Sequence, residues 1–320
     1  MTWTRRQILF GGAALGALAR SRANLAVPGN GEAVPTSGGT MERMRTRPIP
    51  RTGEQLPVIG MGTWRTFDVD ESEDARKPLR EVLRRLFDGG GRLIDSSPMY
   101  GRAEQVVGQL VDPARRPLLA TKVWTSGREE GIDQMRRSMR LMSPHGEGRP
   151  FDLMQIHNLV DWRTHVPTLR AWKEAGTIRY WGITHYSDSA FPEMEEIVRR
   201  EKPDFVQLPY SVAVREAEKR LLPACAGQGV AVLVERPFEA GTLFRDVMKR
   251  PLPRWAAEIE CSSWAQIFLK FILGHPAVNC PIPATSNPEH MADDVRAGFG
   301  RLPDEAMRKR IFEELTGGAR

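Results

Sequence analysis

The stretch DGGGRLIDSSPMYG, residues 88–101, has the pattern of a helix end followed by a short strand and a loop. Its glycines predict the end of an amphipathic helix over residues 73–87, because glycine favours helix termination. The apolar run that follows predicts a short buried strand, which ends on Asp95. A turn-forming segment then presents Tyr100, so the stretch predicts a strand whose end carries two reactive side chains.

The same alternation of a short apolar run and a longer helical run continues along the chain. Beyond the first 46 residues it forms eight units, with predicted strands at 56–64, 92–97, 117–124, 151–158, 179–185, 203–210, 230–237 and 277–285. Helices are expected at 73–87, 104–110, 132–142, 166–175, before residue 200, at 217–228, between 255 and 273, and at 288–297, with a last one at 303–315. The strand runs are apolar throughout, as parallel strands buried on both faces require.

Eight units of this kind predict an α/β fold, a single-domain (β/α)8 TIM barrel over residues 46–320. A doubly wound sheet is disfavoured, because the segment GMGTW at 60–64 lacks the third glycine of a dinucleotide-binding fingerprint. A Thr-Gly turn between two short extended runs at 47–57 predicts a small hairpin at the bottom of the barrel.

Residues 1–23 have the pattern of an export signal. A twin arginine, Arg5 and Arg6, precedes an apolar run at 8–19 and a small-residue cleavage motif at 21–23. The segment resembles a twin-arginine signal and predicts periplasmic or secreted location through the twin-arginine export machinery, without stable membrane insertion. The alternatives are an uncleaved anchor and a basic N-terminus that is not used for export, which leaves the protein in the cytoplasm. Residues 24–45, rich in Gly, Pro, Ser and Thr, predict a flexible linker.

The net charge and the metal-ligating residue types argue against two classes of function. The formal net charge is +6, and four of the positive charges lie in residues 1–23, so no nucleic-acid partner is expected. The six histidines show no ligand spacing at predicted strand ends, which disfavours a metal-dependent barrel hydrolase, and no metal site is expected. The three cysteines are far apart and also lack metal spacing: Cys225, Cys261 and Cys280.

Reactive side chains fall at the ends of three successive predicted strands. Asp95 and Tyr100 follow the second strand, whereas Lys122 ends the third and His157 the fourth. Each alone has an ordinary structural explanation: a helix cap, a packed aromatic ring, a solvated lysine or a core histidine. Because the C-terminal ends of barrel strands form the face on which active sites lie, the four together indicate a catalytic site.

Over nearly all of residues 47–300 the chain resembles the aldo-keto reductase family. The family's blocks occur in the family's order: LPVIGMGTW, LIDSSPMYG, LLATKVW, LMQIHN, KEAGTIRYWGIT, FVQLPYS and IPATSNPEHMADDV. The resemblance implies a (β/α)8 fold, a nicotinamide cofactor and reduction of a small-molecule carbonyl substrate. It places the family's catalytic tetrad on Asp95, Tyr100, Lys122 and His157.

Carbonyl reduction accounts for these four residue types. The reaction needs a proton for the developing alkoxide, and a phenol such as Tyr100 has a reference pKa of about 10. The ammonium of Lys122 is expected to lower that pKa, and Asp95 is expected to supply the counter-charge of Lys122. His157 is expected to hydrogen-bond the carbonyl oxygen and orient it.

The resemblance also implies the nicotinamide end of a cofactor site. Gly62 and Thr63 are expected near the nicotinamide ribose, and the carboxamide is expected to contact Gln207, Thr184 and His185. The family's stacking tyrosine is replaced by Glu235. Arg236, the next residue, is expected against the pyrophosphate, with a position against the nicotinamide face as the alternative.

The adenosine end is expected at a helix N-terminus, where backbone N–H groups favour anions. The residues implied there are Thr285, Ser286, Asn287, His290, Asp293 and Asp294. Family members that prefer NADP often carry a Lys and an Arg at the places of Ala284 and His290. NADP(H) is therefore the expected cofactor on family habit, with NAD(H) as the alternative.

Three tryptophans follow predicted strand ends and suggest an apolar substrate pocket: Trp64, Trp124 and Trp162. Packing at the barrel rim is the alternative explanation for them. The alternative to an enzyme is a cofactor-binding redox sensor or regulatory subunit with little turnover. The complete tetrad favours the enzyme, and the altered stacking and carboxamide positions leave the sensor open.

Overall fold

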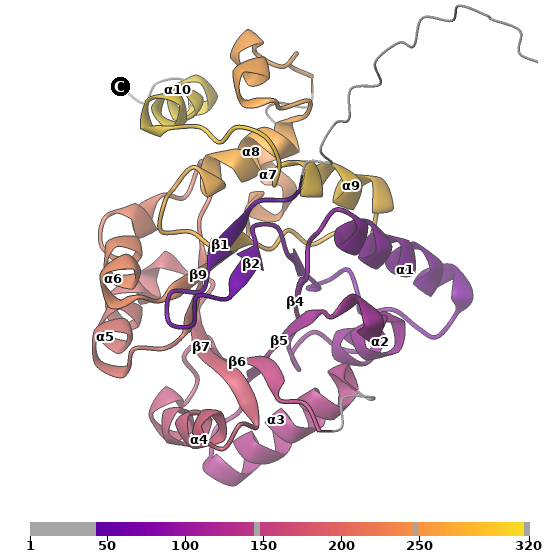
Figure 1. The fold of residues 1–320 in the computed structure, drawn as a ribbon, viewed down its shortest axis with the longest axis vertical. Helices are drawn as coiled ribbons and strands as arrows, with labels where there is room; N and C mark the ends of the chain where they lie inside the picture. Colours follow the sequence, from indigo (N-terminus) through magenta and orange to yellow (C-terminus); the bar gives the residue numbers. More distant parts are fainter. Residues whose placement is uncertain (1–42, 144–147, 246, 248, 317–320) are drawn as a thin grey trace, which may run out of the picture. The chain divides into compact units, whose positions relative to one another are not determined.

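The computed structural model describes residues 43–143, 148–245, 247 and 249–316. The predicted export signal at 1–23 and most of the predicted linker lie outside these residues. Within them, eight parallel strands form one sheet in which neighbours along the chain pair with each other. Their bounds are β3 (Met61–Gly62), β4 (Leu93–Asp95), β5 (Leu118–Val123), β6 (Phe151–His157), β7 (Ile178–Thr184), β8 (Phe205–Pro209), β9 (Ala231–Glu235) and β10 (Cys280–Pro281). The strands form a ring surrounded by helices (Figure 1), which confirms the predicted (β/α)8 barrel.

The ring closes between β3 and β10 through a short junction. The backbone N–H of Gly60 donates to the Pro281 carbonyl at 3.1 Å, and that of Gly62 donates to the Pro283 carbonyl at 3.0 Å. A Cβ atom at Gly62 would lie 3.1 Å from the Ile282 carbonyl oxygen, so the close approach of the two chains favours glycine. The predicted strand over 56–64 is wrong for most of its length, because its first residues pair in a separate hairpin.

That hairpin consists of β1 (Thr46–Pro48) and β2 (Gln55–Pro57), which pair antiparallel as predicted. Leu56 belongs to the apolar cluster inside the barrel. At the turn, Glu54 accepts hydrogen bonds from the Tyr180 hydroxyl at 2.6 Å and from the Arg179 guanidinium. The hairpin therefore covers the N-terminal end of the ring, visible across the ring of strands in Figure 1.

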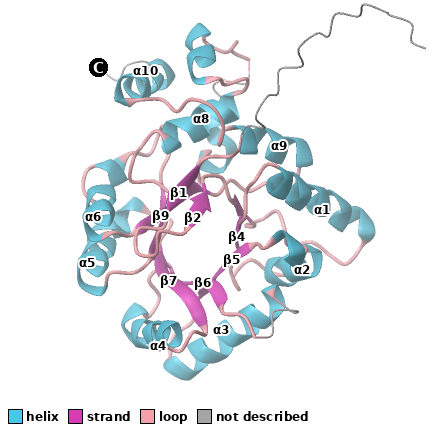
Figure 2. Cartoon of the chain, in the orientation of Figure 1, coloured by secondary structure: helices cyan, strands magenta, loops and turns pink. Residues whose placement is uncertain are grey.

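Helices cover the outside of the ring (Figure 2). Their bounds are α1 (Glu73–Asp88), α2 (Ala103–Leu110), α3 (Arg128–Met142), α4 (Trp162–Glu174), α5 (Phe191–Glu201), α6 (Leu221–Gln228), α7 (Thr242–Arg245), α8 (Trp264–Leu273), α9 (Pro288–Arg296) and α10 (Glu305–Thr316). In α1 the buried side chains recur at helical spacing: Leu79, Val82, Leu83 and Leu86. Among the described residues, no helix has both the length and the apolar character needed to cross a membrane.

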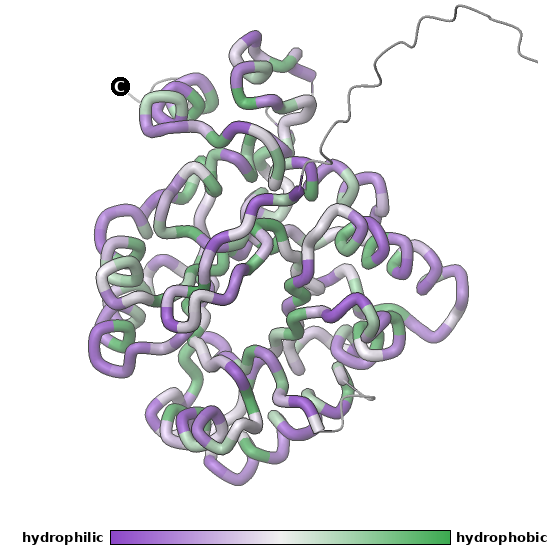
Figure 3. The backbone as a smooth tube through the Cα atoms, viewed as in Figure 1, coloured by the Kyte–Doolittle hydropathy of each residue, from purple (hydrophilic) through white to green (hydrophobic). Residues whose placement is uncertain are grey.

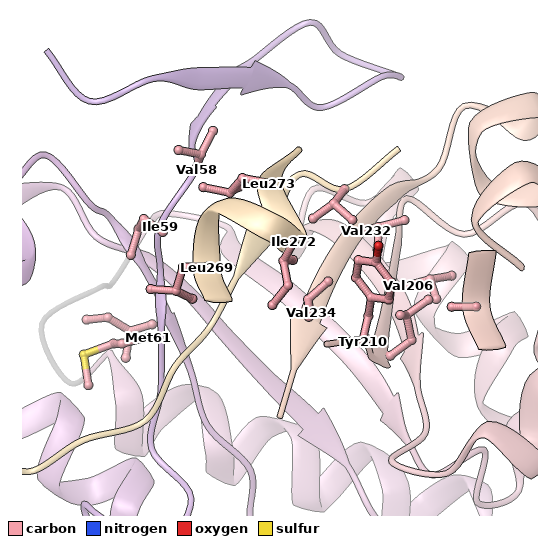
Figure 4. Close-up of a cluster of buried hydrophobic side chains, with 14 of the residues drawn as sticks. Val58, Ile59, Met61, Val206, Tyr210, Val232, Val234, Leu269, Ile272 and Leu273 are labelled. Atoms are coloured by element: carbon pink, nitrogen blue, oxygen red, sulfur yellow. The ribbon is translucent and has the colours of Figure 1, made fainter. Parts of the chain in front are cut away.

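Two apolar clusters stabilise the barrel. The larger lies between strands and helices, where Ile272 of α8 lies beside Val234 and Leu269 lies towards Ile59 and Met61 (Figure 4). Hydrophobic residues accordingly concentrate on the strands and the inward helix faces (Figure 3). The smaller cluster fills the barrel interior: Ile49, Leu56, Leu93, Leu118, Ala120, Leu153, Tyr180, Phe205, Ala231, Leu233, Cys280 and Ile282.

Candidate active site

A layer of polar side chains lies above the interior cluster, towards the C-terminal ends of the strands. Successive side chains of a strand point to opposite faces, so a residue two positions after an interior residue also points inward. Five strands carry a polar residue two positions after a member of the interior cluster. We call these residues the polar layer: Asp95, Lys122, Gln155, Gln207 and Glu235.

Lys122 and Asp95 form a buried ion pair within the polar layer. Lys122 Nζ lies 2.6 Å from Asp95 Oδ2 and also donates to the Ser96 carbonyl oxygen at 2.6 Å. The second carboxylate oxygen, Asp95 Oδ1, accepts from Gln155 Nε2 at 2.9 Å. Lys122 is 0% and Asp95 3% exposed, so water does not reach either charge, and these contacts replace the lost hydration.

Tyr100 lies over this pair on the loop that follows β4. The backbone N–H of Tyr100 donates to the Ser97 carbonyl at 3.0 Å, and Gly101 turns the chain at φ 61. Lys122 Nζ lies 5.3 Å from the centroid of the Tyr100 ring. Burial, together with the charges of Asp95 and Glu235, raises the pKa of the Tyr100 hydroxyl. This direction is opposite to the lowering expected from Lys122, whose charge is compensated by Asp95.

His157 meets Tyr100 edge to face, with ring centroids 5.8 Å apart. Its Nδ1 lies 2.8 Å from Ser97 Oγ, and that hydroxyl accepts from the Met99 backbone N–H at 3.3 Å. The Ser97 proton is thus free to point at Nδ1, which places the imidazole proton on Nε2. Burial and the nearby Lys122 charge lower the pKa of His157 to about 3, so the ring is neutral.

Several buried polar atoms beside the tetrad have no hydrogen-bond partner. They are Asn158 Oδ1, Thr184 Oγ1, both side-chain amide atoms of Gln207, and Glu235 Oε1. Buried polar groups are normally hydrogen-bonded, so a group of unpartnered atoms indicates a position for a ligand. Thr184 pairs with Gln207 in the β7–β8 register, as His157 pairs with Thr184 in the β6–β7 register.

The other residues expected at the nicotinamide end lie around the same mouth. Thr63 is buried, and its hydroxyl lies 3.0 Å from the Asp95 carbonyl oxygen and 2.9 Å from Ser96 Oγ. His185 follows β7 and its Nδ1 accepts from the Ser187 backbone N–H at 3.0 Å. Arg236 is exposed, has φ 54, and pairs with Glu239 at 3.4 Å.

Four of the residues expected at the adenosine end lie at or just before the start of α9, whereas Asp293 and Asp294 lie further along the helix. Asn287 caps the helix through its side chain, and its backbone N–H donates to Thr285 Oγ1 at 3.0 Å. His290 Nδ1 lies 3.5 Å from Thr285 Oγ1, while Ser286 is exposed. Asp294 is buried at 3% exposure.

The carboxylate of Asp293 accepts two hydrogen bonds from α8 and its N-cap residue. It accepts from Ser263 Oγ at 2.5 Å and from Gln266 Nε2 at 2.6 Å. Since Ser263 is the N-cap of α8, Asp293 links α9 to the start of that helix. The structure therefore gives Asp293 a connection between helices that its sequence position did not suggest.

Two of the three tryptophans expected at the substrate pocket lie at the barrel mouth. Trp64 is 43% and Trp124 42% exposed, and the Trp124 ring centroid lies 6.4 Å from that of His157. The expectation is wrong for Trp162, which is only 6% exposed and donates from its indole N–H to Glu193 of α5 at 2.8 Å. The reason is that α4 begins at Trp162 rather than near residue 166, so the residue packs between helices.

Sequence inspection missed three residues that complete the site: Ser97, Gln155 and Asn158. Glu235 was noticed only as a departure from the family pattern. The alternation of side chains along a strand is the signal that finds Gln155, which lies two positions before His157 in LMQIHN. No comparable signal marks Ser97, because its contact with His157 joins residues that are 60 positions apart.

The described residues contain no group of three or more His, Cys, Asp or Glu side chains arranged to hold a metal ion.

A sequence profile described as "Aldo/keto reductase family" matches residues 58–310, most of the chain. The chain belongs to the aldo/keto reductase family.

Two proteins with curated descriptions align along most of the barrel. Methylglyoxal reductase YeaE of Escherichia coli strain K12 is 27% identical over 257 residues, which cover 78% of this chain and 88% of that protein. The oxidoreductase C215.11c of Schizosaccharomyces pombe is 27% identical over 271 residues, which cover 79% of this chain and 83% of that protein.

Solved structures of other family members have the same fold. A Klebsiella pneumoniae aldo-keto reductase in complex with NADPH has a TM-score of 0.69 at 24% identity, covering 85% of this chain and 95% of that chain. The holo form of AKR11C1 from Bacillus halodurans has a TM-score of 0.68 at 20% identity, covering 87% of this chain and 98% of that chain.

Proposed function

We propose that this aldo/keto reductase reduces an aldehyde or ketone to an alcohol with NADP(H), and that NAD(H) is the alternative cofactor. Membership of the family supports carbonyl reduction. The Klebsiella pneumoniae structures of family members in complex with NADP and with NADPH support the cofactor. The observation that carries the proposal is the position of Tyr100, partly buried beside the Lys122–Asp95 pair and edge to face with His157.

Tyr100 is the proposed proton donor. Its raised pKa keeps the hydroxyl protonated, and an alkoxide formed at a carbonyl oxygen is basic enough to take the proton from a phenol. Lys122 then lies close to the phenolate that forms and stabilises its charge. Asp95 and Gln155 hold Lys122 in place, and neutral His157 donates from Nε2 to the same carbonyl oxygen.

The unpartnered polar atoms of the mouth fit a nicotinamide carboxamide. Gln207 offers both an amide donor and an amide acceptor, and Thr184 adds a hydroxyl. A carboxamide presents the complementary acceptor and donor, so these residues are proposed to hold it in one orientation. The bound reduced nicotinamide supplies the hydride that the carbonyl carbon receives.

We propose a small carbonyl compound as the substrate class. The relative in Escherichia coli is described as a methylglyoxal reductase. Trp64 and Trp124, both partly exposed at the mouth, offer apolar surface to the part of the substrate beyond the carbonyl group.

A panel of aldehydes and ketones, assayed with NADPH and NADH, tests the proposed function. We expect many turnovers for each protein molecule with at least one small aldehyde, measured as loss of reduced-nicotinamide absorbance. Tight cofactor binding without turnover on the whole panel would instead support a redox sensor or regulatory subunit. The ratio of kcat/KM for NADPH and NADH decides the cofactor preference.

We further propose that residues 1–23 direct export through the twin-arginine machinery, with the barrel as the exported part. The twin arginine Arg5 and Arg6 supports this proposal. Replacement of both arginines by lysine should retain the protein in the cytoplasm, as measured by cell fractionation. An unchanged distribution between compartments would contradict export by this route.

A further inference from the structure

Glu235 carries a buried carboxylate oxygen without a hydrogen-bond partner in the polar layer of the active site. We propose that Glu235 distinguishes the oxidised from the reduced nicotinamide by charge, binding the oxidised form as a carboxylate and the reduced form as a neutral acid. The inference rests on the proposed function, since it requires that the mouth binds a nicotinamide cofactor.

The strand register places Glu235 next to the atoms that fit the carboxamide. Gln207 pairs with Leu233, and Pro209 pairs with Glu235, so Glu235 lies two residues closer to the mouth than Gln207. Leu233 belongs to the interior cluster, and the side chain two positions later therefore points into the barrel. Its Oε1 and both amide atoms of Gln207 are buried and lack partners. One ligand can satisfy these atoms together.

The charges around Glu235 leave its own carboxylate uncompensated. Lys122 is paired with Asp95 at 2.6 Å, and Arg236 is paired with Glu239 at 3.4 Å. Tyr100 is protonated because its pKa is raised, and His157 is neutral because its pKa is about 3.

The strands on either side of Glu235 do not alter this balance. On β8, Gln207 is neutral, and the described residues of that strand include no ionisable side chain. On β10, burial raises the pKa of the Cys280 thiol, which therefore stays neutral. When Glu235 is ionised, the described groups of the polar layer sum to one negative charge, which is complementary to a ligand with one positive charge.

Both protonation states of Glu235 are populated near neutral pH. Burial raises its pKa to about 7, with Asp95 raising it further and Lys122 and Arg236 lowering it. A nicotinamide ring carries a positive charge when oxidised and none when reduced. The positive charge of the oxidised ring therefore favours the carboxylate form of Glu235. The reduced ring only shields Glu235 further from water, which favours its neutral acid form.

Cofactor binding must then move protons in opposite directions. Binding of NADP+ at about pH 7 should release protons from Glu235, and binding of NADPH should take protons up. Isothermal titration of the nucleotide-free full-length protein, in two buffers of different ionisation enthalpy, measures both quantities directly. No catalytic turnover is needed for this measurement.

The ratio of the two dissociation constants gives a second readout. We expect Kd(NADPH)/Kd(NADP+) to rise about five- to tenfold from about pH 6 to about pH 8, since one pKa unit corresponds to a factor of ten. Titration of the phosphate groups is common to both forms and cancels in the ratio. In Glu235→Gln the ratio should become independent of pH, and the opposite proton movements should disappear.

Glu104→Gln is the matched control. Glu104 is also a buried carboxylate with a raised pKa, but it lies behind β5, where it accepts from Thr121 and Ser138. This variant should keep the pH dependence of the wild-type ratio. Binding of both cofactors with a pH-independent ratio in the wild type would overturn the inference alone. Failure of both cofactors to bind would overturn the proposed function and the inference with it.

Discussion

Lys122 Nζ lies 2.6 Å from Asp95 Oδ2, and Gln155 Nε2 lies 2.9 Å from the other oxygen of the same carboxylate. The three residues come from adjacent strands, β4, β5 and β6, and all lie inside the barrel. An ion pair without access to water is costly to form, yet removal of one partner is costlier still because a buried charge remains. The Lys122–Asp95 pair therefore contributes to the stability of the folded barrel as well as to the proposed chemistry of the site.

Asp95→Asn should destabilise the protein strongly. The variant leaves the buried ammonium of Lys122 without a counter-charge, so we expect a loss of about 3 kcal/mol or more in the free energy of unfolding. Urea denaturation followed by intrinsic fluorescence measures this loss. The double variant Asp95→Asn with Lys122→Met, which removes both charges, should recover most of the stability. Wild-type stability of the single variant would contradict the importance of the pair.

Tyr100→Phe should abolish carbonyl reduction while cofactor affinity survives. Loss of a positioned proton donor lowers kcat by about a hundredfold or more. Steady-state kinetics with the best aldehyde of the panel and cofactor fluorescence titration provide the two readouts. Undiminished turnover in the variant would remove Tyr100 from the role of proton donor.

Ser97→Ala should change the tautomer of His157. Without the hydroxyl that donates to Nδ1 at 2.8 Å, the imidazole proton is no longer restricted to Nε2. We expect kcat to fall by about tenfold, the cost of one neutral hydrogen bond, with little change in cofactor affinity. Nitrogen-15 NMR of the imidazole measures the tautomer directly.

Ser96→Ala is the control for that measurement. Its hydroxyl lies 2.9 Å from Thr63 Oγ1, in the same loop as Ser97. The described contacts of the Ser96 hydroxyl do not include His157, so the NMR signature of the imidazole should match that of the wild type. A wild-type signature in Ser97→Ala as well would show that another group sets the tautomer.

Glu235→Gln should stabilise the free protein at neutral and alkaline pH. The folded-state pKa of Glu235 is raised from 4.5 to about 7, so the wild type loses stability relative to the variant as pH rises between these values. Below about pH 4.5 the difference should vanish, and above about pH 7 it should level off at no more than about 3 kcal/mol. Thermal or urea denaturation of both proteins over this range measures the difference. A difference that does not change with pH would mean that the Glu235 carboxyl is not perturbed.

The barrel was predictable because its signal is repeated. Eight apolar runs separated by helical periods leave few other arrangements, and the tetrad followed from the ends of those runs. The bounds were less predictable where tertiary pairing decides them, as in β3, which shrinks to Met61–Gly62 because residues 55–57 pair with β1.

Contacts between distant residues explain the remaining differences. The sequence pattern could not show that Asp293 accepts hydrogen bonds from Ser263 and Gln266, or that Trp162 lies between helices. The raised pKa of Tyr100 is a similar case, because it comes first from burial and then from the charges of Asp95 and Glu235, none of which the sequence pattern shows. Residue types predicted which groups would meet, but not how their charges would balance.

The junction between β3 and β10 bears on how water reaches the interior. Each strand contributes only two residues there, whereas β6 and β7 have seven residues each. Short ladders break first in local opening, so amide hydrogen exchange should be faster at Gly60 and Gly62 than along β6. Thr63 follows directly and its hydroxyl contacts the Asp95 carbonyl oxygen, so opening of the junction should let water approach the Lys122–Asp95 pair. The rate at which water reaches the buried charges should therefore follow the rate of local opening at Gly60 and Gly62.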